Sequence, residues 1–176
     1  NEAALMDPQL RLLLETAWQA LESAGYPSGE IATKVGVFAG SNISTYLLRR
    51  ISDPEFVKSV DEFEAMIAND RDALATSVSY KLDLKGPSLT VQTFGFTSAV
   101  AVHLAGQSLR QGECGMALAG GVSLRAPAKV GYLYQAGDQV SPDGHTRTFD
   151  HQAGGTVFGD GVGVVVLKRV SDAQRD

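Results

Sequence analysis

The chain has 176 residues, 44% of them hydrophobic and 20% charged, which is the composition expected of an ordinary globular protein. Fifteen basic and 20 acidic residues give a net charge of −5, which argues against nucleic acid or an anionic membrane as the main partner. No apolar run approaches the roughly 20 residues of a membrane span, the first residues show no signal-peptide pattern, and the single cysteine excludes an internal disulfide, so we expect a cytoplasmic protein.

The first segment predicts a helix that begins at Asp7-Pro8 and ends at Gly25. Aspartate is a favoured N-cap residue, proline a favoured first helical residue, and glycine a common residue after the last turn. Between these signals, apolar residues recur at three- and four-residue spacing and predict one buried face: Leu10, Leu13, Leu14, Ala17, Trp18 and Leu21. We therefore expect Trp18 to pack in the core.

The rest of the chain alternates between predicted strands and helices. Strands are expected at 34–42, 88–92, 114–124 and 161–170, and helices at 42–70 (broken near Asp53-Pro54), 72–84 and 98–111, with a turn-rich loop at 141–161. Three of the strands look buried on both faces. This alternation is typical of an α/β fold with a largely parallel sheet covered on both sides. Both ends of the chain look cut, because it starts on a helix and stops just after its most apolar strand.

The junction between strand 88–92 and the following helix has the form of a nucleophile-bearing elbow. A helix N-terminus carries about half a positive charge and N–H groups without intrahelical partners. Such a site lowers the pKa of a thiol and can bind the oxyanion of an acyl-transfer intermediate. Here the turn holds Gly95, between Phe94 and Phe96. The turn could therefore position a nucleophile, but Gly95 has no reactive side chain.

Several long motifs, in order, resemble the ketosynthase domain of modular polyketide synthases, within the β-ketoacyl synthase and thiolase-like superfamily. They are MDPQLRLLLETAWQALESAGY, NDRDALATSVSYKLDLKGPSLTVQT, GECGMALAGGVSL and SPDGHTRTFDHQAGGTVFGDGVGVVVLKR. The resemblance implies a thiolase-like α/β fold, layered α-β-α-β-α in the complete domain. Residues 1–176 would then be a partial N-terminal β-ketoacyl synthase domain, truncated at both ends, covering mainly the first of the two halves.

The resemblance also implies a reaction and its partners. The family performs decarboxylative Claisen condensation of acyl and malonyl carrier-protein thioesters. The implied partners are an acyl carrier protein, the remaining half of the domain, neighbouring synthase domains and a second copy in a homodimer. No directly bound cofactor is implied, because the acyl group arrives on the phosphopantetheine of the carrier protein. Neither nucleic acid nor a membrane is an expected partner.

The active-site motif departs from the family pattern. Relatives read T-A-C-[ST]-[ST]-S, whereas this chain reads T-F-G-F-T-S, so Gly95 stands at the position of the nucleophilic cysteine. The resemblance therefore implies a copy that does not condense, acting as a non-elongating or scaffold unit. Its site would consist of the Gly95 backbone N–H as an oxyanion donor, with Phe94, Phe96, Thr97 and Ser98 as candidates for the substrate pocket.

Two alternatives remain at this stage. The domain could decarboxylate a malonyl-carrier substrate without a covalent acyl-enzyme, or it could be purely a structural dimerisation module. The family's catalytic histidine and lysine motifs, which lie in the second half of the domain, do not occur in this chain.

Other residues that could carry chemistry have simpler interpretations. Thr97 and Ser98 are expected to form first-turn hydrogen bonds, and Cys114 to be a buried thiol. We expect His103 to be a structural histidine, His145 and His151 to be loop residues, and Arg147 to pair with Asp150. The scattered histidines do not suggest a metal site. The glycines at 159, 161 and 163 lead into a strand, so they do not match a dinucleotide-binding loop.

Overall fold

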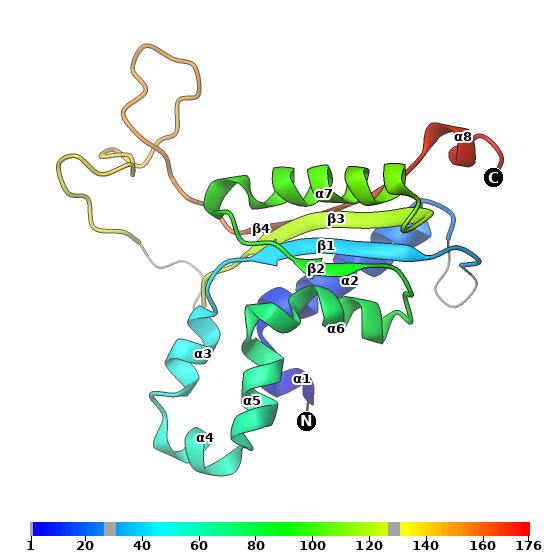
Figure 1. Cartoon of the computed structure of the whole chain (residues 1–176). Helices are drawn as coiled ribbons and strands as arrows, with labels where there is room; N and C mark the ends of the chain where they lie inside the picture. Colours follow the sequence, from blue (N-terminus) through cyan, green and yellow to red (C-terminus); the bar gives the residue numbers. More distant parts are fainter. Residues whose placement is uncertain (1, 27–30, 127–130) are drawn as a thin grey trace.

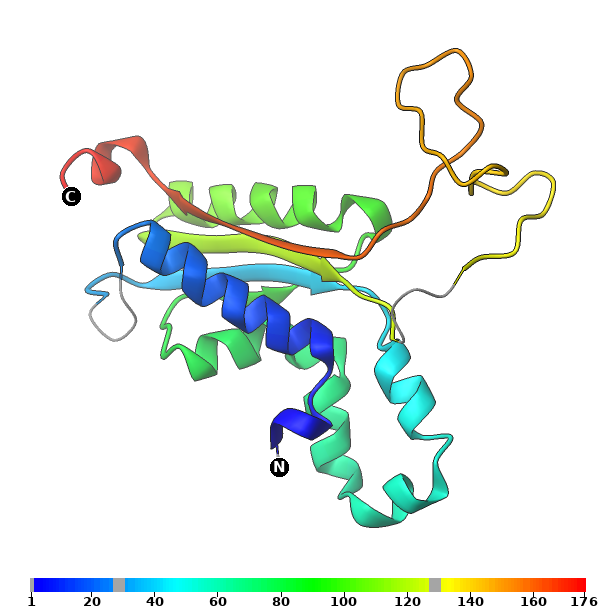
Figure 2. The same cartoon turned by 180° about the vertical axis from the view of Figure 1, so that it is seen from behind.

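The computed structural model describes residues 2–26, 31–126 and 131–176. Its centre is one mixed sheet with the strand order β2-β1-β3-β4. The strands are β1 (Val35–Ser41), β2 (Ser88–Thr90), β3 (Met116–Ser123) and β4 (Gly161–Lys168). Strand β1 runs parallel to β2 and β3, whereas β4 is antiparallel to β3. Helix α7 (Thr97–Gln111) lies on one face, and α2 (Pro8–Ser23) and α6 (Leu74–Lys81) lie on the other (Figures 1 and 2). The expected α/β fold is confirmed.

Helix α2 begins and ends where the sequence predicted. The Asp7 side chain accepts a hydrogen bond from the Gln9 backbone N–H at 2.8 Å, and Gly25 adopts φ +83° after the last turn. One stripe of the helix is buried in the core: Leu10, Leu13, Ala17 and Leu21. The expectation for Trp18 was wrong, because its side chain is 47% exposed. Trp18 lies beside that stripe, on the same side of the helix as the half-buried Leu14 four residues earlier. The described elements do not cover its side chain.

The segment between β1 and β2 is more broken than expected. It contains α3 (Thr45–Arg50), α4 (Pro54–Ser59), α5 (Glu62–Asn69), the 3-10 turn η1 (Arg71–Ala73) and α6. The break at Asp53-Pro54 is confirmed, and Asp61 creates a second one by accepting hydrogen bonds from the first backbone N–H groups of α5. Two short helices complete the description, α1 (Glu2–Leu5) and α8 (Val170–Ala173). Figure 1 shows α3, α4 and α5 projecting away from the sheet.

Burial differs sharply between the strands. All of β1 and most of β3 are buried, as expected for strands covered on both faces. Strand β4 alternates between exposed and half-buried residues, and Val165 is 48% exposed. The difference comes from position, because β4 is an edge strand in the described part of the sheet.

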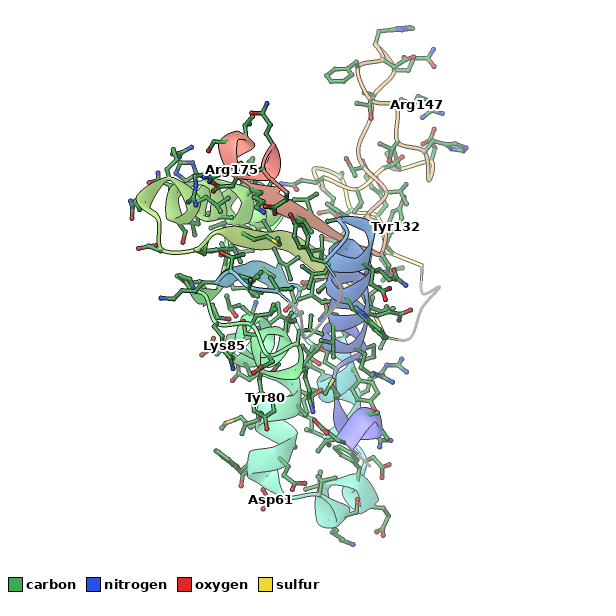
Figure 3. The ribbon with its side chains drawn as sticks, turned by 90° about the vertical axis from the view of Figure 1, so that its right-hand side faces the viewer. Asp61, Tyr80, Lys85, Tyr132, Arg147 and Arg175 are labelled. Carbon is green, nitrogen blue, oxygen red and sulfur yellow. The ribbon has the colours of Figure 1, made fainter. Side chains whose placement is uncertain are left out.

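The connection from β3 to β4 is a long projecting loop (Figure 1). Arg125 holds its base, because its guanidinium donates to the Phe158 carbonyl at 2.8 Å and its backbone N–H donates to Asp160 at 3.1 Å. Within the loop, Arg147 forms its ion pair with Asp143 at 2.8 Å, so the expected pairing with Asp150 was wrong. Figure 3 shows Arg147 far out on this loop.

Candidate functional site

The candidate site is the turn that joins β2 to α7. Strand β2 ends at Thr90, and the chain stays attached to β1 for one more residue, because the Val91 N–H donates to the Ala39 carbonyl at 2.9 Å. A single 3-10 turn, η2 (Phe94–Phe96), then leads directly into α7. The predicted strand–turn–helix elbow is therefore present, and its helix starts one residue earlier than expected.

Thr97 holds this turn closed. Its hydroxyl accepts a hydrogen bond from the Thr93 N–H at 3.0 Å and donates one to the Phe94 carbonyl at 2.8 Å. The expected first-turn hydrogen bonding is therefore confirmed for Thr97. Ser98, the next residue, is exposed on the first turn of α7.

Two glycines in neighbouring strands lie under the elbow, and we call Gly40 and Gly121 the glycine floor. A Cβ on Gly40 would lie 2.0 Å from the Val91 carbonyl oxygen and 2.3 Å from the Thr97 methyl group. A Cβ on Gly121 would lie 3.8 Å from the Cβ of Ser98. Only a strand without a side chain at residue 40 lets the elbow come this close to the sheet. The glycine floor was not predicted from the sequence, although glycines at strand ends are a signal of close backbone approach.

Gly95 is not required by the shape of the turn. Its φ is not positive, whereas Phe94 adopts φ +52°, the left-handed region that favours glycine. Apart from its two chain neighbours, no heavy atom of the described chain lies within 4 Å of where a Cβ on Gly95 would be. A side chain at residue 95 would therefore be sterically accepted by the fold.

The aromatic residues on either side of Gly95 point into solvent. The Phe94 side chain is fully exposed and the Phe96 side chain is 74% exposed. Neither ring belongs to the two hydrophobic clusters of the core. A large cavity of about 1100 Å³ does exist, but it lies among α1, α4, α5 and α6 and no elbow residue lines it.

The remaining candidates lie apart from the elbow or carry no catalytic arrangement. Cys114 is 2% exposed, with its Sγ 3.4 Å from the Ser108 hydroxyl, as expected for a buried thiol. His103 is exposed on α7, with its Nε2 at 2.9 Å from the Gln107 amide nitrogen. His145 and His151 are exposed loop residues, as expected. Across residues 2–26, 31–126 and 131–176, no cluster of three potential metal ligands is found, and no helix is long and apolar enough to span a membrane.

Comparison with known proteins identifies the family. The family model described as "Beta-ketoacyl synthase, N-terminal domain" matches residues 1–173. The chain belongs to the β-ketoacyl synthase family. Among curated β-ketoacyl synthase relatives, it is 48% identical to a component of the phenolphthiocerol/phthiocerol polyketide synthase of Mycobacterium tuberculosis, with 97% of this chain and 12% of that protein covered. It is 42% identical to the polyketide synthase GfsB of Streptomyces halstedii, with 100% of this chain and 3% of that protein covered.

Solved ketosynthase structures share the fold. Ketosynthase twelve of the bacillaene polyketide synthase from Bacillus amyloliquefaciens superposes with a TM-score of 0.89 at 39% identity, with 98% of this chain and 30% of that chain covered. The oxazolomycin ketosynthase domain OzmH KS7 from Streptomyces albus gives a TM-score of 0.82 at 34% identity, with 99% of this chain and 30% of that chain covered. The thiolase-like fold class is thus confirmed. The present chain spans about a third of the length of these solved ketosynthase chains.

Proposed function

We propose that this chain is part of a ketosynthase domain that cannot form an acyl-enzyme. The observation that carries the proposal is Gly95, which stands without a side chain at the tip of an otherwise complete strand–turn–helix elbow. Covalent acyl transfer needs a nucleophile at such a site, and glycine offers none. Because the turn does not need glycine at residue 95, the fold alone does not account for the missing side chain.

The neighbouring hydroxyl groups do not replace the nucleophile. The Thr97 hydroxyl is committed to two hydrogen bonds that close the turn. Ser98 is exposed, but a serine hydroxyl needs an adjacent base to become reactive. The nearest histidine along the chain, His103, lies five residues further on and contacts Gln107. Among the residues that the structure describes, the elbow therefore has neither a free nucleophile with a reactive side chain nor an adjacent base.

The partners follow from membership in the family. In the complete domain, an acyl carrier protein would present its acyl-phosphopantetheine, and the second half of the domain would complete the pocket around Gly95, Phe94, Phe96, Thr97 and Ser98. A second copy would pair along β2, which is an edge strand whose Leu89 is exposed. The role of this copy would be to hold or pass on a carrier-bound chain, as a non-elongating or scaffold unit.

The test uses the complete ketosynthase domain that contains this chain. It is incubated with an acetyl-loaded carrier protein and examined by intact mass spectrometry. We expect no acyl adduct on the unaltered domain. The matched control is the triple variant Phe94→Ala, Gly95→Cys and Phe96→Ser, which we expect to gain one acetyl group. A stoichiometric adduct on the unaltered domain would overturn the proposal.

A second candidate function is malonyl-carrier decarboxylation without a covalent intermediate. The location of Gly95 in the first helical turn favours it, because backbone N–H groups there lack intrahelical partners and can stabilise developing negative charge. Release of carbon dioxide from a malonyl-loaded carrier protein by the complete domain would support this function. If none is released above the rate without protein, the scaffold role is preferred.

A further inference from the structure

Thr97 holds the backbone of the elbow through both functions of its hydroxyl group. The hydroxyl oxygen accepts a hydrogen bond from the Thr93 N–H at 3.0 Å, and the hydroxyl donates one to the Phe94 carbonyl at 2.8 Å. The Thr97 backbone N–H donates to the same carbonyl. One residue therefore fixes two peptide groups, the one that precedes Thr93 and the one that joins Phe94 to Gly95.

The second of these peptide groups sets the direction of the Gly95 N–H. A peptide group is planar and trans, so its N–H points opposite to its carbonyl. Because the Phe94 carbonyl is directed at Thr97, the Gly95 N–H is directed away from Thr97 and out of the start of the helix. N–H groups at a helix start have no intrahelical partner and can bind negative charge. A hydrogen bond accepted by the carbonyl also polarises its peptide group, which makes the N–H a stronger donor.

The conformation of Phe94 shows that the turn needs this support. Its φ is +52°, in a region that residues other than glycine rarely adopt. Such backbone strain persists where the surrounding contacts fix it. Towards the sheet, the Thr97 methyl group lies so close to Gly40 that a Cβ there would be 2.3 Å from it. The Thr97 side chain is thus packed against the sheet while its hydroxyl holds the strained turn.

We propose that Thr97 is a positioning residue, which holds the Gly95 N–H where it stabilises developing negative charge on a carrier-bound thioester. The elbow then keeps the electrostatic part of its site although it has no nucleophile. This role rests on the proposed function, since it takes residue 95 as the place where the acyl group is received. The hydroxyl group of Thr97 produces the effect, and the volume of its side chain does not.

A thiol placed at residue 95 measures this effect, because N–H groups held at a helix start lower the pKa of a thiol. The experiment uses the complete ketosynthase domain with Gly95→Cys alone and combined with Thr97→Val or Thr97→Ser. Valine keeps the volume of threonine and removes the hydroxyl, whereas serine keeps the hydroxyl and removes the methyl group. Alkylation of the new thiol by iodoacetamide is followed by peptide mass spectrometry from about pH 5 to about pH 10, and the midpoint of the rate profile gives its pKa.

The hydroxyl should decide the pKa of the new thiol. With Gly95→Cys alone, we expect a pKa about one unit or more below the ordinary thiol value of about 8.5. Adding Thr97→Val should raise this pKa by about one unit, which lowers the thiolate fraction at neutral pH about tenfold, whereas Thr97→Ser should keep it within about 0.3 units. If the valine variant does not fold, Thr97→Ala removes the same hydroxyl with a smaller side chain.

The matched control is Thr76→Val in the Gly95→Cys domain. The Thr76 hydroxyl also donates to the carbonyl three residues earlier, that of Ala73 at 3.1 Å, but it does so in the first turn of α6. Thr76→Val should therefore leave the pKa of the new thiol unchanged.

The possible results separate this role from the missing nucleophile. Equal pKa values with valine and with serine at residue 97 would overturn the role of the hydroxyl, whether both are low or both are raised. An ordinary pKa for the thiol of Gly95→Cys, or no alkylation at any pH, would also overturn it, because residue 95 would then offer no N–H to a charged group. An acyl adduct on the unaltered domain would instead overturn the proposed function and leave the comparison of pKa values unaffected.

Discussion

Gln9 and Asn42 exchange two hydrogen bonds at the end of strand β1. The Gln9 amide nitrogen donates to the Asn42 carbonyl at 3.0 Å, and the Asn42 N–H donates to the Gln9 amide oxygen at 3.2 Å. The same oxygen accepts from the Leu124 N–H at 3.2 Å, just beyond the end of β3. Because β1 and β3 diverge after the Ser41–Val122 pair, the side-chain amide stands in for a peptide group between them. Through Gln9, helix α2 thereby holds the ends of β1 and β3, which lead into α3 and the long loop.

Replacing Gln9 by leucine should destabilise the chain by about 2 kcal/mol, since the Asn42 carbonyl and the Leu124 N–H would lose their partner, whereas the Asn42 N–H keeps the Val122 carbonyl at 3.1 Å. Gln9 is only 2% exposed, so water cannot readily take its place. Urea unfolding followed by circular dichroism measures the change. Gln19→Leu, on the exposed face of the same helix, is the matched control and should stay within about 0.5 kcal/mol. Equal effects of the two substitutions would contradict the role of the Gln9 amide.

The glycines of the site make a second prediction. Gly40→Ala should destabilise the chain by about 1–3 kcal/mol and shift the elbow, because its Cβ would clash with the Val91 carbonyl and the Thr97 methyl group. Gly95→Ala should have an effect within about 0.5 kcal/mol, since its Cβ would meet open space and its φ is not positive. Thermal unfolding of the two variants gives the comparison. A larger loss for Gly95→Ala than for Gly40→Ala would mean that the turn itself selects glycine at 95.

Structural features that depend on one residue and its nearest backbone groups could be predicted from the sequence. The cap at Asp7-Pro8 and the end of α7 at Gly112, which adopts φ +77°, each depend on one residue and its nearest backbone groups. They were therefore predicted correctly. The burial of Trp18 was not, because it depends on which distant elements lie beside the helix.

The candidate site shows the same division. The position of Gly95 in a strand–turn–helix elbow could be predicted, because periodicity and motif order locate it. The directions of the Phe94 and Phe96 rings could not, since a positive φ at a phenylalanine has no sequence signature. The glycines at the strand ends signalled a close backbone approach, but that the elbow is the segment that approaches them could not be predicted, because it requires knowing that β1 lies directly under the turn. Likewise, Arg147 had two aspartates within reach along the chain, and only the loop geometry selects Asp143.

The long loop should respond to acid at unusually low pH. Hydrogen bonds from the Ser141 hydroxyl and then the Arg147 guanidinium lower the pKa of Asp143 to about 2. A carboxyl with a lowered pKa stabilises the folded loop above its unfolded pKa of about 3.9, and this contribution is lost as the pH falls through about 2. The His145 N–H, which donates to Asp143 at 3.1 Å, reports the change as an NMR chemical shift. The shift should titrate near pH 2, and Asp143→Asn should abolish it. A midpoint near pH 4 would rule out these contacts in solution.

Arg169 connects the end of β4 to the C-terminus of α7, and its removal should weaken that connection. Its guanidinium donates to the Leu109 carbonyl and, at 3.2 Å, to the Cys114 carbonyl, while Asp172 holds it in place. Leu109 lies in the last turn of α7, where a positive charge is favourable, and Cys114 lies between α7 and β3. Arg169→Met should therefore cost about 1–2 kcal/mol in urea unfolding and speed amide exchange in the last turn of α7. Arg175→Met is the matched control, because Arg175 also pairs with Asp172 but is 75% exposed. It should change stability by less than about 0.5 kcal/mol. If both substitutions had the same small effect, the link between β4 and α7 would not depend on the Arg169 guanidinium.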